Sequence, residues 1–191
     1  MRICFLFITH FSKRRTGRMP AFDDKISLML SSRKVLVIDD EHYTRKVIRT
    51  LLMAMGVKHV QEAADGNSGL DVICTVAPDI ILCDWEMPGL DGPAFVRAVR
   101  SPETFPHPDI PIIMLTAHGE RSRVVEAARL GIHEYLLKPV SSQSLQARLL
   151  SVITHPRKMV RRGDYYGPEP RKTSAYKPSA DQDFSHIVML N

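Results

Sequence analysis

The stretch DIILCD at residues 79–84 places four consecutive apolar residues directly before an aspartate. Residues 35–38 (VLVI) and 112–115 (IIML) are further short apolar runs, whereas residues 57–62 alternate and residues 134–137 form a fifth, weaker segment. Short continuous apolar runs are typical of parallel strands that are covered on both faces. The pattern predicts five strands, with residues 57–62 at an edge of the sheet.

Amphipathic helical patterns separate the predicted strands, and each has a recognisable start or end. The residues that mark these points are Gly56 after the first helix, Asp65 and Pro78 at the ends of the second, Pro93 at the start of the third, Gly131 after the fourth, and Ser141 or Ser142 before the fifth. Parallel neighbours need a crossover, and a helix is the usual one. Five strands alternating with five helices therefore predict an α/β fold, a doubly wound five-stranded parallel sheet of order 2-1-3-4-5.

Polar residues directly follow four of the predicted strands: Asp39 and Asp40 the first, Asp84 the third, Thr116 the fourth and Lys138 the fifth. The ligand site of an open parallel sheet lies beyond the carboxyl ends of its strands, so we expect these side chains to converge at one edge. Clustered carboxylates repel one another, and a hard divalent cation with oxygen ligands compensates them. The pattern favours Mg²⁺, which binds through one or two carboxylates, waters and a substrate phosphate.

Four stretches together resemble one known family, and they anchor the likeness across residues 33–154. They are VLVIDDE at 35–41, DIILCDWEMPGLDG at 79–92, PIIMLTAHG at 111–119 and YLLKP at 135–139. The combination resembles the receiver domains of bacterial response regulators, including the stand-alone chemotaxis type. The resemblance implies a flavodoxin-like fold and a role as a phosphorylation-dependent switch in two-component signalling.

The resemblance also assigns roles to the residues at the strand ends. It implies that Asp84 is the phosphorylation site, the nucleophile that accepts a phosphoryl group from a sensor histidine kinase or a histidine phosphotransfer protein. Asp39, Asp40 and Asp84, with the backbone carbonyl of Glu86, would hold Mg²⁺. The remaining catalytic groups would be Lys138, which neutralises charge on the phosphoryl oxygens, and Thr116, which donates a hydrogen bond to one of them.

A switching step follows from the same resemblance. Thr116 would move toward the phosphoryl group, and Tyr135 would turn into the space that Thr116 leaves. The surface of the fourth helix, fifth strand and fifth helix would then select a downstream protein or a second copy in a phosphorylation-dependent dimer. A cis peptide is expected between Lys138 and Pro139.

The net charge of +5 is concentrated at the two ends of the chain. Residues 1–32 carry +4 and residues 155–191 carry +3, whereas residues 33–154 carry −2. We expect residues 1–32 to be a basic extension, and Met19 and Met29, as alternative starts, leave open whether residues 1–28 are native. Residues 155–191, a basic segment with prolines and tyrosines, are expected to be disordered.

The composition favours a cytoplasmic protein. Cys4, Cys74 and Cys83 have neither metal-ligand spacing nor an even count, which is typical of a reducing compartment. The apolar run at residues 3–8 is too short to span a membrane.

Three other functions are alternatives to a phosphorylated receiver that acts through protein contacts. A receiver-like interaction module that is never phosphorylated would be favoured by loss of Asp84 or Lys138, and both are present. In a haloacid-dehalogenase-type phosphatase the nucleophilic aspartate follows the first strand, and an acid/base aspartate lies two positions later. Here that later position is Glu41. A DNA-binding domain has no room in residues 155–191, although weak nucleic-acid contact through that basic segment stays open.

Overall fold

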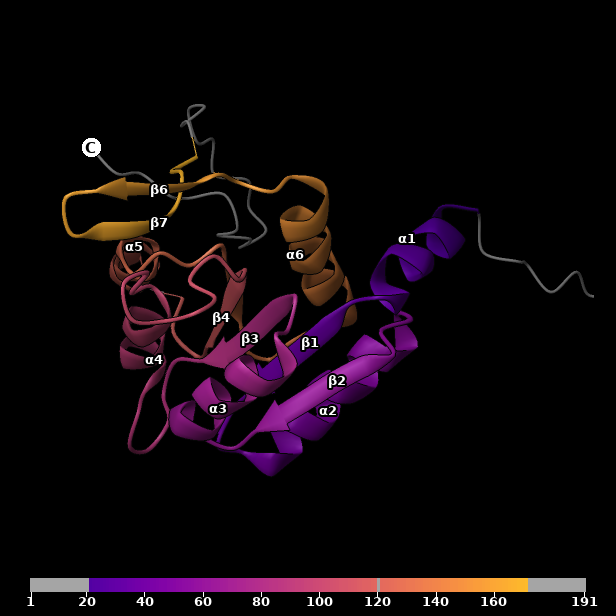
Figure 1. The fold of residues 1–191 in the computed structure, drawn as a ribbon. Coiled ribbons are helices and arrows are strands. Elements are labelled where there is room, and N and C mark those ends of the chain that lie inside the picture. The colour runs from indigo at the N-terminus through magenta and orange to yellow at the C-terminus, as the bar shows by residue number, and fades with distance from the viewer. Residues whose placement is uncertain (1–20, 120, 172–191) are drawn as a thin grey trace, which may run out of the picture.

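The computed structural model describes residues 21–119 and 121–171. Thirteen helices and strands are present in this part of the chain (Figure 1). In chain order they are α1 (Ala21–Ser31), β1 (Lys34–Ile38), α2 (His42–Ala54), β2 (His59–Ala63), α3 (Gly66–Val76), β3 (Ile80–Asp84), α4 (Gly92–Val99), β4 (Ile112–Thr116), α5 (Arg121–Arg129), β5 (Glu134–Leu137), α6 (Ser142–Thr154), β6 (Met159–Arg162) and β7 (Tyr165–Pro168).

Five parallel strands form the central sheet in the order β2-β1-β3-β4-β5. This is the predicted order, with β2 at an edge. The chain passes from β2 across β1 to β3, so the strand order reverses between β1 and β3. The carboxyl ends of these two strands therefore border the crevice where open α/β sheets bind ligands.

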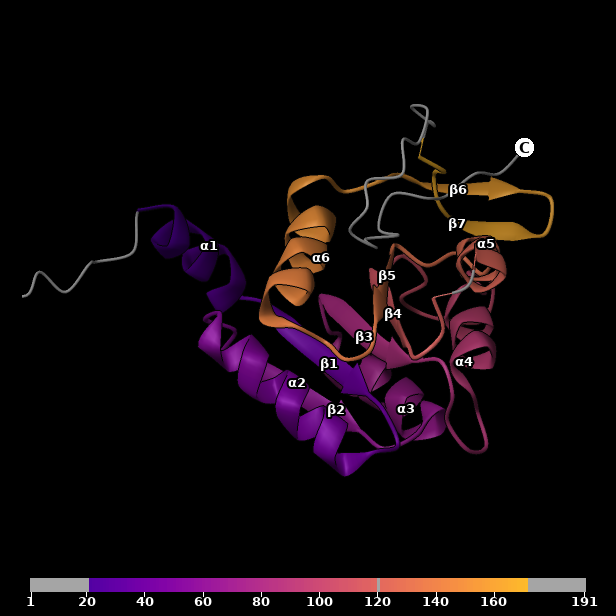
Figure 2. The same ribbon diagram turned by 180° about the vertical axis from the view of Figure 1, so that it is seen from behind.

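Helices cover both faces of the sheet, as Figures 1 and 2 show from opposite sides. On one face Val37 belongs to the same buried cluster as Leu52 of α2 and Leu149 of α6. On the other face Ile38 belongs to a cluster that includes Phe95 of α4. Neighbouring residues of β1 thus point to opposite cores, which explains why the strand is apolar without alternation.

The predicted helix boundaries are confirmed where a cap can be identified. The Asp65 side chain accepts a hydrogen bond from the Ser68 N–H at 2.8 Å, which caps α3. Ser141 rather than Ser142 caps α6, because the Ser141 side chain accepts from the Ser144 N–H at 3.1 Å. The cap satisfies one of the N–H groups that have no partner within the helix.

The described chain contains six helices rather than the five predicted, and the additional one is α1. It lies in the segment expected to be a basic extension, residues 1–32. Ile26 and Leu30 of α1 are 5% and 0% exposed and belong to the core cluster of α2 and α6. The folded unit therefore begins before residue 33, because α1 covers apolar surface at the ends of α2 and α6.

The expectation that residues 155–191 are disordered is wrong for residues 155–171. Strands β6 and β7 pair as an antiparallel hairpin with Gly163 in its turn. The rest of that expectation, residues 172–191, lies outside the described residues. The hairpin lies beside α5, at the end of the sheet where β4 and β5 begin (Figures 1 and 2).

Contacts with distant parts of the chain hold the hairpin segment. Arg157 donates hydrogen bonds to the carbonyls of Ile132, at 3.4 Å, and His133. The Tyr166 hydroxyl donates to the Asp109 carboxylate. A few side-chain contacts to loops that precede β4 and β5 thus order a segment that has little core of its own.

The proline-rich stretch before β4 forms a loop, and Arg100 fixes it. This buried side chain donates hydrogen bonds to the Gly131 carbonyl at 2.8 Å and the Ile110 carbonyl at 2.9 Å, and to the Pro108 carbonyl. Burial lowers the pKa of Arg100 to about 10, so the guanidinium stays charged at neutral pH. Arg100 thereby holds the loops before β4 and β5 together beneath the hairpin.

None of the helices in the described ranges is long and apolar enough to cross a bilayer. The longest, α2 and α6, contain 13 residues each, whereas a spanning helix needs about 20.

Candidate functional site

Three carboxylates meet where the strand order reverses. Asp39 and Asp40 follow β1 and Asp84 ends β3, and one oxygen of each lies within 4.8 Å of the others. Asp39 is fully buried and Asp84 is 6% exposed, whereas Asp40 faces solvent. The predicted convergence of these residues is confirmed, although they come from separate strands.

Lys138 lies between two of the carboxylates. Its Nζ is 2.8 Å from Asp39 Oδ2 and 2.8 Å from Asp84 Oδ1. The lysine follows β5, and the peptide bond between it and Pro139 is cis, as expected. An ammonium group thus lies beside the acidic residues at the same edge of the sheet.

Burial and ion pairing act in opposite directions on these groups. Burial raises the pKa of Asp84, while the hydrogen bond and charge of Lys138 act to lower it. Burial alone would lower the pKa of Lys138, but the hydrogen bonds and charges of Asp39 and Asp84 raise it above its ordinary value. Lys138 is therefore protonated at neutral pH and offsets the repulsion between the carboxylates.

Thr116 and Tyr135 lie on adjacent strands next to this cluster. Thr116 is 1% exposed, and its Oγ1 accepts a hydrogen bond from the His118 N–H at 3.0 Å. The Tyr135 hydroxyl donates to the His118 carbonyl. Both residues thus contact the loop that follows β4, and a displacement of that loop would affect them together.

The donors present suit Mg²⁺, because three carboxylates from two loops converge and hard divalent cations prefer oxygen ligands. The Glu86 side chain is directed elsewhere, with its Oε1 3.2 Å from His118 Nε2. The expected ligand from Glu86 is its backbone carbonyl, and that assignment stays a prediction.

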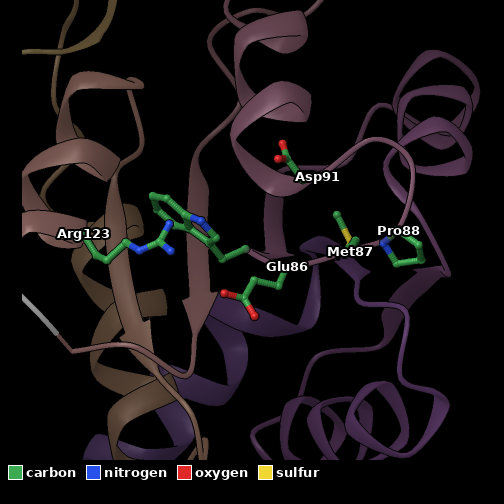
Figure 3. A pocket seen from close by; sticks show the side chains of 6 residues that line it. Glu86, Met87, Pro88, Asp91 and Arg123 are labelled. Carbon is green, nitrogen blue, oxygen red and sulfur yellow. The ribbon is translucent and has the colours of Figure 1, made fainter.

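The segment that directly follows Asp84 lines a pocket of about 490 Å³ (Figure 3). Glu86, Met87, Pro88 and Asp91 line it together with Trp85 and Arg123. The Arg123 guanidinium of α5 stacks over the Trp85 ring, 5.2 Å from its centroid, an arrangement in which cation and aromatic face attract each other. The segment after Asp84 is thereby connected directly to α5.

Two contributors to the site were absent from the sequence prediction. Arg123 is one, and no local pattern pairs it with Trp85. Arg45 is the other: its Nη1 donates to the carbonyls of Asp39, at 2.7 Å, and Asp40, at 3.2 Å. A signal for Arg45 exists, because a residue in the first turn of the helix after the acidic pair can reach back to it.

The response regulator receiver domain is the family whose description matches this chain, over residues 35–150. The match covers more than half of the chain and includes every residue of the acidic cluster. The chain therefore belongs to the response regulator receiver domain family, the class of phosphorylation-dependent signalling modules in two-component systems.

Within this class the chain is similar to chemotaxis proteins. It is 35% identical over 116 residues to the chemotaxis protein CheY of Pseudomonas aeruginosa, a match that covers 61% of this chain and 92% of that protein. The solved structure of Vibrio cholerae CheY4 shares 32% of its sequence with a TM-score of 0.57, covering 63% of this chain and 98% of that one.

A second kind of relative is a longer protein that the chain matches over only part of its length. The chain is 36% identical over 125 residues to a protein named as a probable transcriptional regulator, ycf27 of Guillardia theta. That match covers 65% of this chain and 47% of the relative. The shared region is therefore the receiver domain, and the likeness does not extend to the rest of that regulator.

Proposed function

We propose that this protein is a signalling switch that accepts a phosphoryl group on Asp84 and acts through protein–protein contacts. The observation that carries the proposal is the placement of Lys138 Nζ 2.8 Å from both Asp39 and Asp84 at the reversal point of the sheet. A single ammonium there can balance the charge of a nucleophilic carboxylate and of an incoming phosphoryl group. The donor would be a sensor histidine kinase or a histidine phosphotransfer protein.

In the proposed reaction an Asp84 carboxylate oxygen attacks the phosphorus of a phosphohistidine. A new O–P bond forms, the N–P bond breaks, and its electron pair stays on the imidazole of the donor. The loose transition state of phosphoryl transfer demands little covalent chemistry, so positioning and charge neutralisation suffice. Water later attacks the mixed anhydride and restores Asp84, so the protein catalyses only its own phosphorylation and dephosphorylation.

Asp39, Asp40 and Asp84, with the Glu86 carbonyl, would hold Mg²⁺. The cation supplies charge stabilisation for the phosphoryl oxygens when it is bound. Asp39 also orients Lys138, because Asp39 Oδ2 accepts a hydrogen bond from the ammonium at 2.8 Å. Arg45 fixes the backbone of the acidic pair from the first turn of α2.

The proposed output begins at Thr116, whose hydroxyl would turn from the His118 N–H to a phosphoryl oxygen. The loop after β4 would then shift, and Tyr135 would exchange its hydrogen bond to the His118 carbonyl for an inward position. The face formed by α5, β5 and α6 would change and select a downstream protein, or a second copy in a phosphorylation-dependent dimer. We place this activity in the cytoplasm.

Phosphorylation of the full chain by acetyl phosphate tests the proposal. Wild-type protein should incorporate one phosphoryl group in the presence of Mg²⁺ and none after chelation, and Asp84→Asn should abolish incorporation. Asp71→Asn is a matched control, since Asp71 is an exposed aspartate on α3 outside the site. Incorporation that survives Asp84→Asn, or labelling found on Asp39, would contradict the assignment and favour a phosphatase-like reaction. No incorporation into the wild-type protein would instead favour an unphosphorylated interaction module.

A further inference from the structure

An apolar groove of about 540 Å³ lies between α1 and α6. Ile26 and Met29 of α1 line it on one side, and Ala147 and Leu150 of α6 on the other. The two helices lie next to each other in both ribbon views (Figures 1 and 2). No residue of the acidic cluster lines the groove, so the groove is separate from the proposed phosphorylation site.

The described chain ends beside this groove. Arg171, its last residue, donates hydrogen bonds to the Ser151 hydroxyl at 3.1 Å and to the Glu134 carboxylate. Ser151 lines the groove and in turn donates to Glu134 at 2.7 Å. Arg171 therefore contacts α6 at a residue that also lines the groove.

Residues 172–191 contain one concentrated apolar stretch, FSHIVML at residues 184–190. We propose that residues 184–190 bind in the groove between α1 and α6. Phe184 follows Arg171 by 13 residues, a chain length that reaches at most about 45 Å when extended. Attachment to the same chain raises the effective concentration of residues 184–190 at the groove above that of a free peptide, so even a weak contact is populated.

The charges around the groove match those of the proposed occupant. Lys25 lines the groove together with its apolar residues. Asp181 and Asp183 directly precede the apolar stretch. Residues 3–8 at the other end of the chain are also apolar, but basic residues follow them and would face Lys25. The combination of apolar content, acidic neighbours and attachment beside Ser151 favours residues 184–190.

Binding there would connect α6 to α1 through a third segment. Helix α6 also contributes to the proposed output face with α5 and β5. Residues 184–190 would therefore restrain the helix through which the switch contacts other proteins, from the side opposite to that face.

Backbone amide NMR of the full-length protein tests the proposal. The variant Val188→Asp/Leu190→Asp places two charges in the apolar stretch, and Ala175→Asp/Ala180→Asp is its control with the same charge outside it. The amide signals of Ile26, Leu150 and Ser151 should shift in the first variant and stay unchanged in the second.

A substitution in the groove gives the reciprocal test. Ala147→Glu introduces a carboxylate at an exposed groove position of α6, and Gln143→Glu does so at an exposed position of α6 that does not line the groove. The amide signals of residues 184–190 should shift only in Ala147→Glu. The proposal would be overturned if the amide signals of the groove residues stayed unchanged in both Val188→Asp/Leu190→Asp and Ala175→Asp/Ala180→Asp. Groove signals that shift on dilution, or in Phe5→Asp/Phe7→Asp, would also overturn it, because a second copy or residues 3–8 would then be the occupant.

Discussion

Lys138 is the residue on which the proposed chemistry of the site depends, because it contacts both a buried and a nearly buried carboxylate. The ion pairs with Asp39 and Asp84 hold its pKa above the ordinary value in spite of burial. Thr116 ends the neighbouring strand β4 and carries no charge. The two residues should therefore contribute differently to rate and to signalling.

Substituting each residue by alanine should separate these contributions. Lys138→Ala should slow phosphorylation by acetyl phosphate by roughly 10²-fold, as expected when a charge-stabilising donor is removed. Thr116→Ala should slow it by only about tenfold, the effect of one hydrogen bond. Trp85, the single tryptophan of the chain, directly follows Asp84, and its fluorescence can follow the reaction.

Two controls accompany this measurement. Lys158→Ala removes an exposed ammonium at the far end of the sheet and should leave the rate unchanged. Thr116→Ser keeps the hydroxyl and should restore both the rate and the response of the Tyr135 ring signals to phosphorylation. A normal Tyr135 response in phosphorylated Thr116→Ala and Lys138→Ala would contradict the proposed switch.

At the scale of the elements, the hairpin of β6 and β7 depends on a close approach of two backbones. Gly131, which follows α5 and has a φ of 88°, lies against Gly167 of β7. A Cβ added at Gly131 would lie 2.5 Å from the Tyr166 carbonyl oxygen and 3.2 Å from the Gly167 Cα. Both the positive φ and the contact therefore require glycine at this position.

Comparing Gly131→Ala with Gly163→Ala separates the effect of the contact between Gly131 and β7 from the cost of a positive φ in alanine. Gly163 in the hairpin turn also has a positive φ, 58°, but a Cβ there would meet nothing within 4 Å. Gly163→Ala should lower the free energy of unfolding by about 1 kcal/mol. Gly131→Ala should lower it by at least about 2 kcal/mol, because backbone must also shift. Equal losses in urea unfolding would mean that the hairpin does not pack on Gly131.

The sequence predicts the strands better than the hairpin, for a physical reason. Residues 80–83 are apolar because both faces of β3 are covered, so the pattern is local and readable. Met159 and Val160 are only half-buried, and the hairpin is ordered by partners such as Asp109 that are far away in the sequence. The same distinction applies to the site: Asp84 and Lys138 are attached to strand ends, whereas the pairing of Arg123 with Trp85 depends on how α5 packs.

At the scale of the whole molecule, α1 extends the hydrophobic core beyond the five-helix receiver fold. The matched family region begins at residue 35, yet Leu30 is completely buried against the same core as α2 and α6. Cores are close-packed, so a buried leucine contributes to the stability of the entire domain. The resemblance could not reveal this helix, because α1 lies outside the motifs that carry the likeness.

Substitutions in α1 measure how far the folded unit extends. Leu30→Ala should lower the free energy of unfolding by about 2–5 kcal/mol, the usual cost of removing a buried leucine side chain. Leu28→Ala, two residues earlier, should have an effect within about 0.5 kcal/mol, because Leu28 is 74% exposed. Denaturant unfolding of both variants gives the comparison. A neutral Leu30→Ala would show that α1 is not part of the cooperative unit.

The hairpin also determines which ends of β4 and β5 can be displaced. Arg157 binds the carbonyls of Ile132 and His133 just before β5, and the His133 N–H donates to the Ile112 carbonyl of β4 at 2.8 Å. These contacts restrain the amino ends of the two strands more than their carboxyl ends. A force applied at Thr116 or Lys138, near their carboxyl ends, then displaces those ends most and the hairpin least. Such a deflection is delivered to the first turns of α5 and α6, which begin directly beyond the strands.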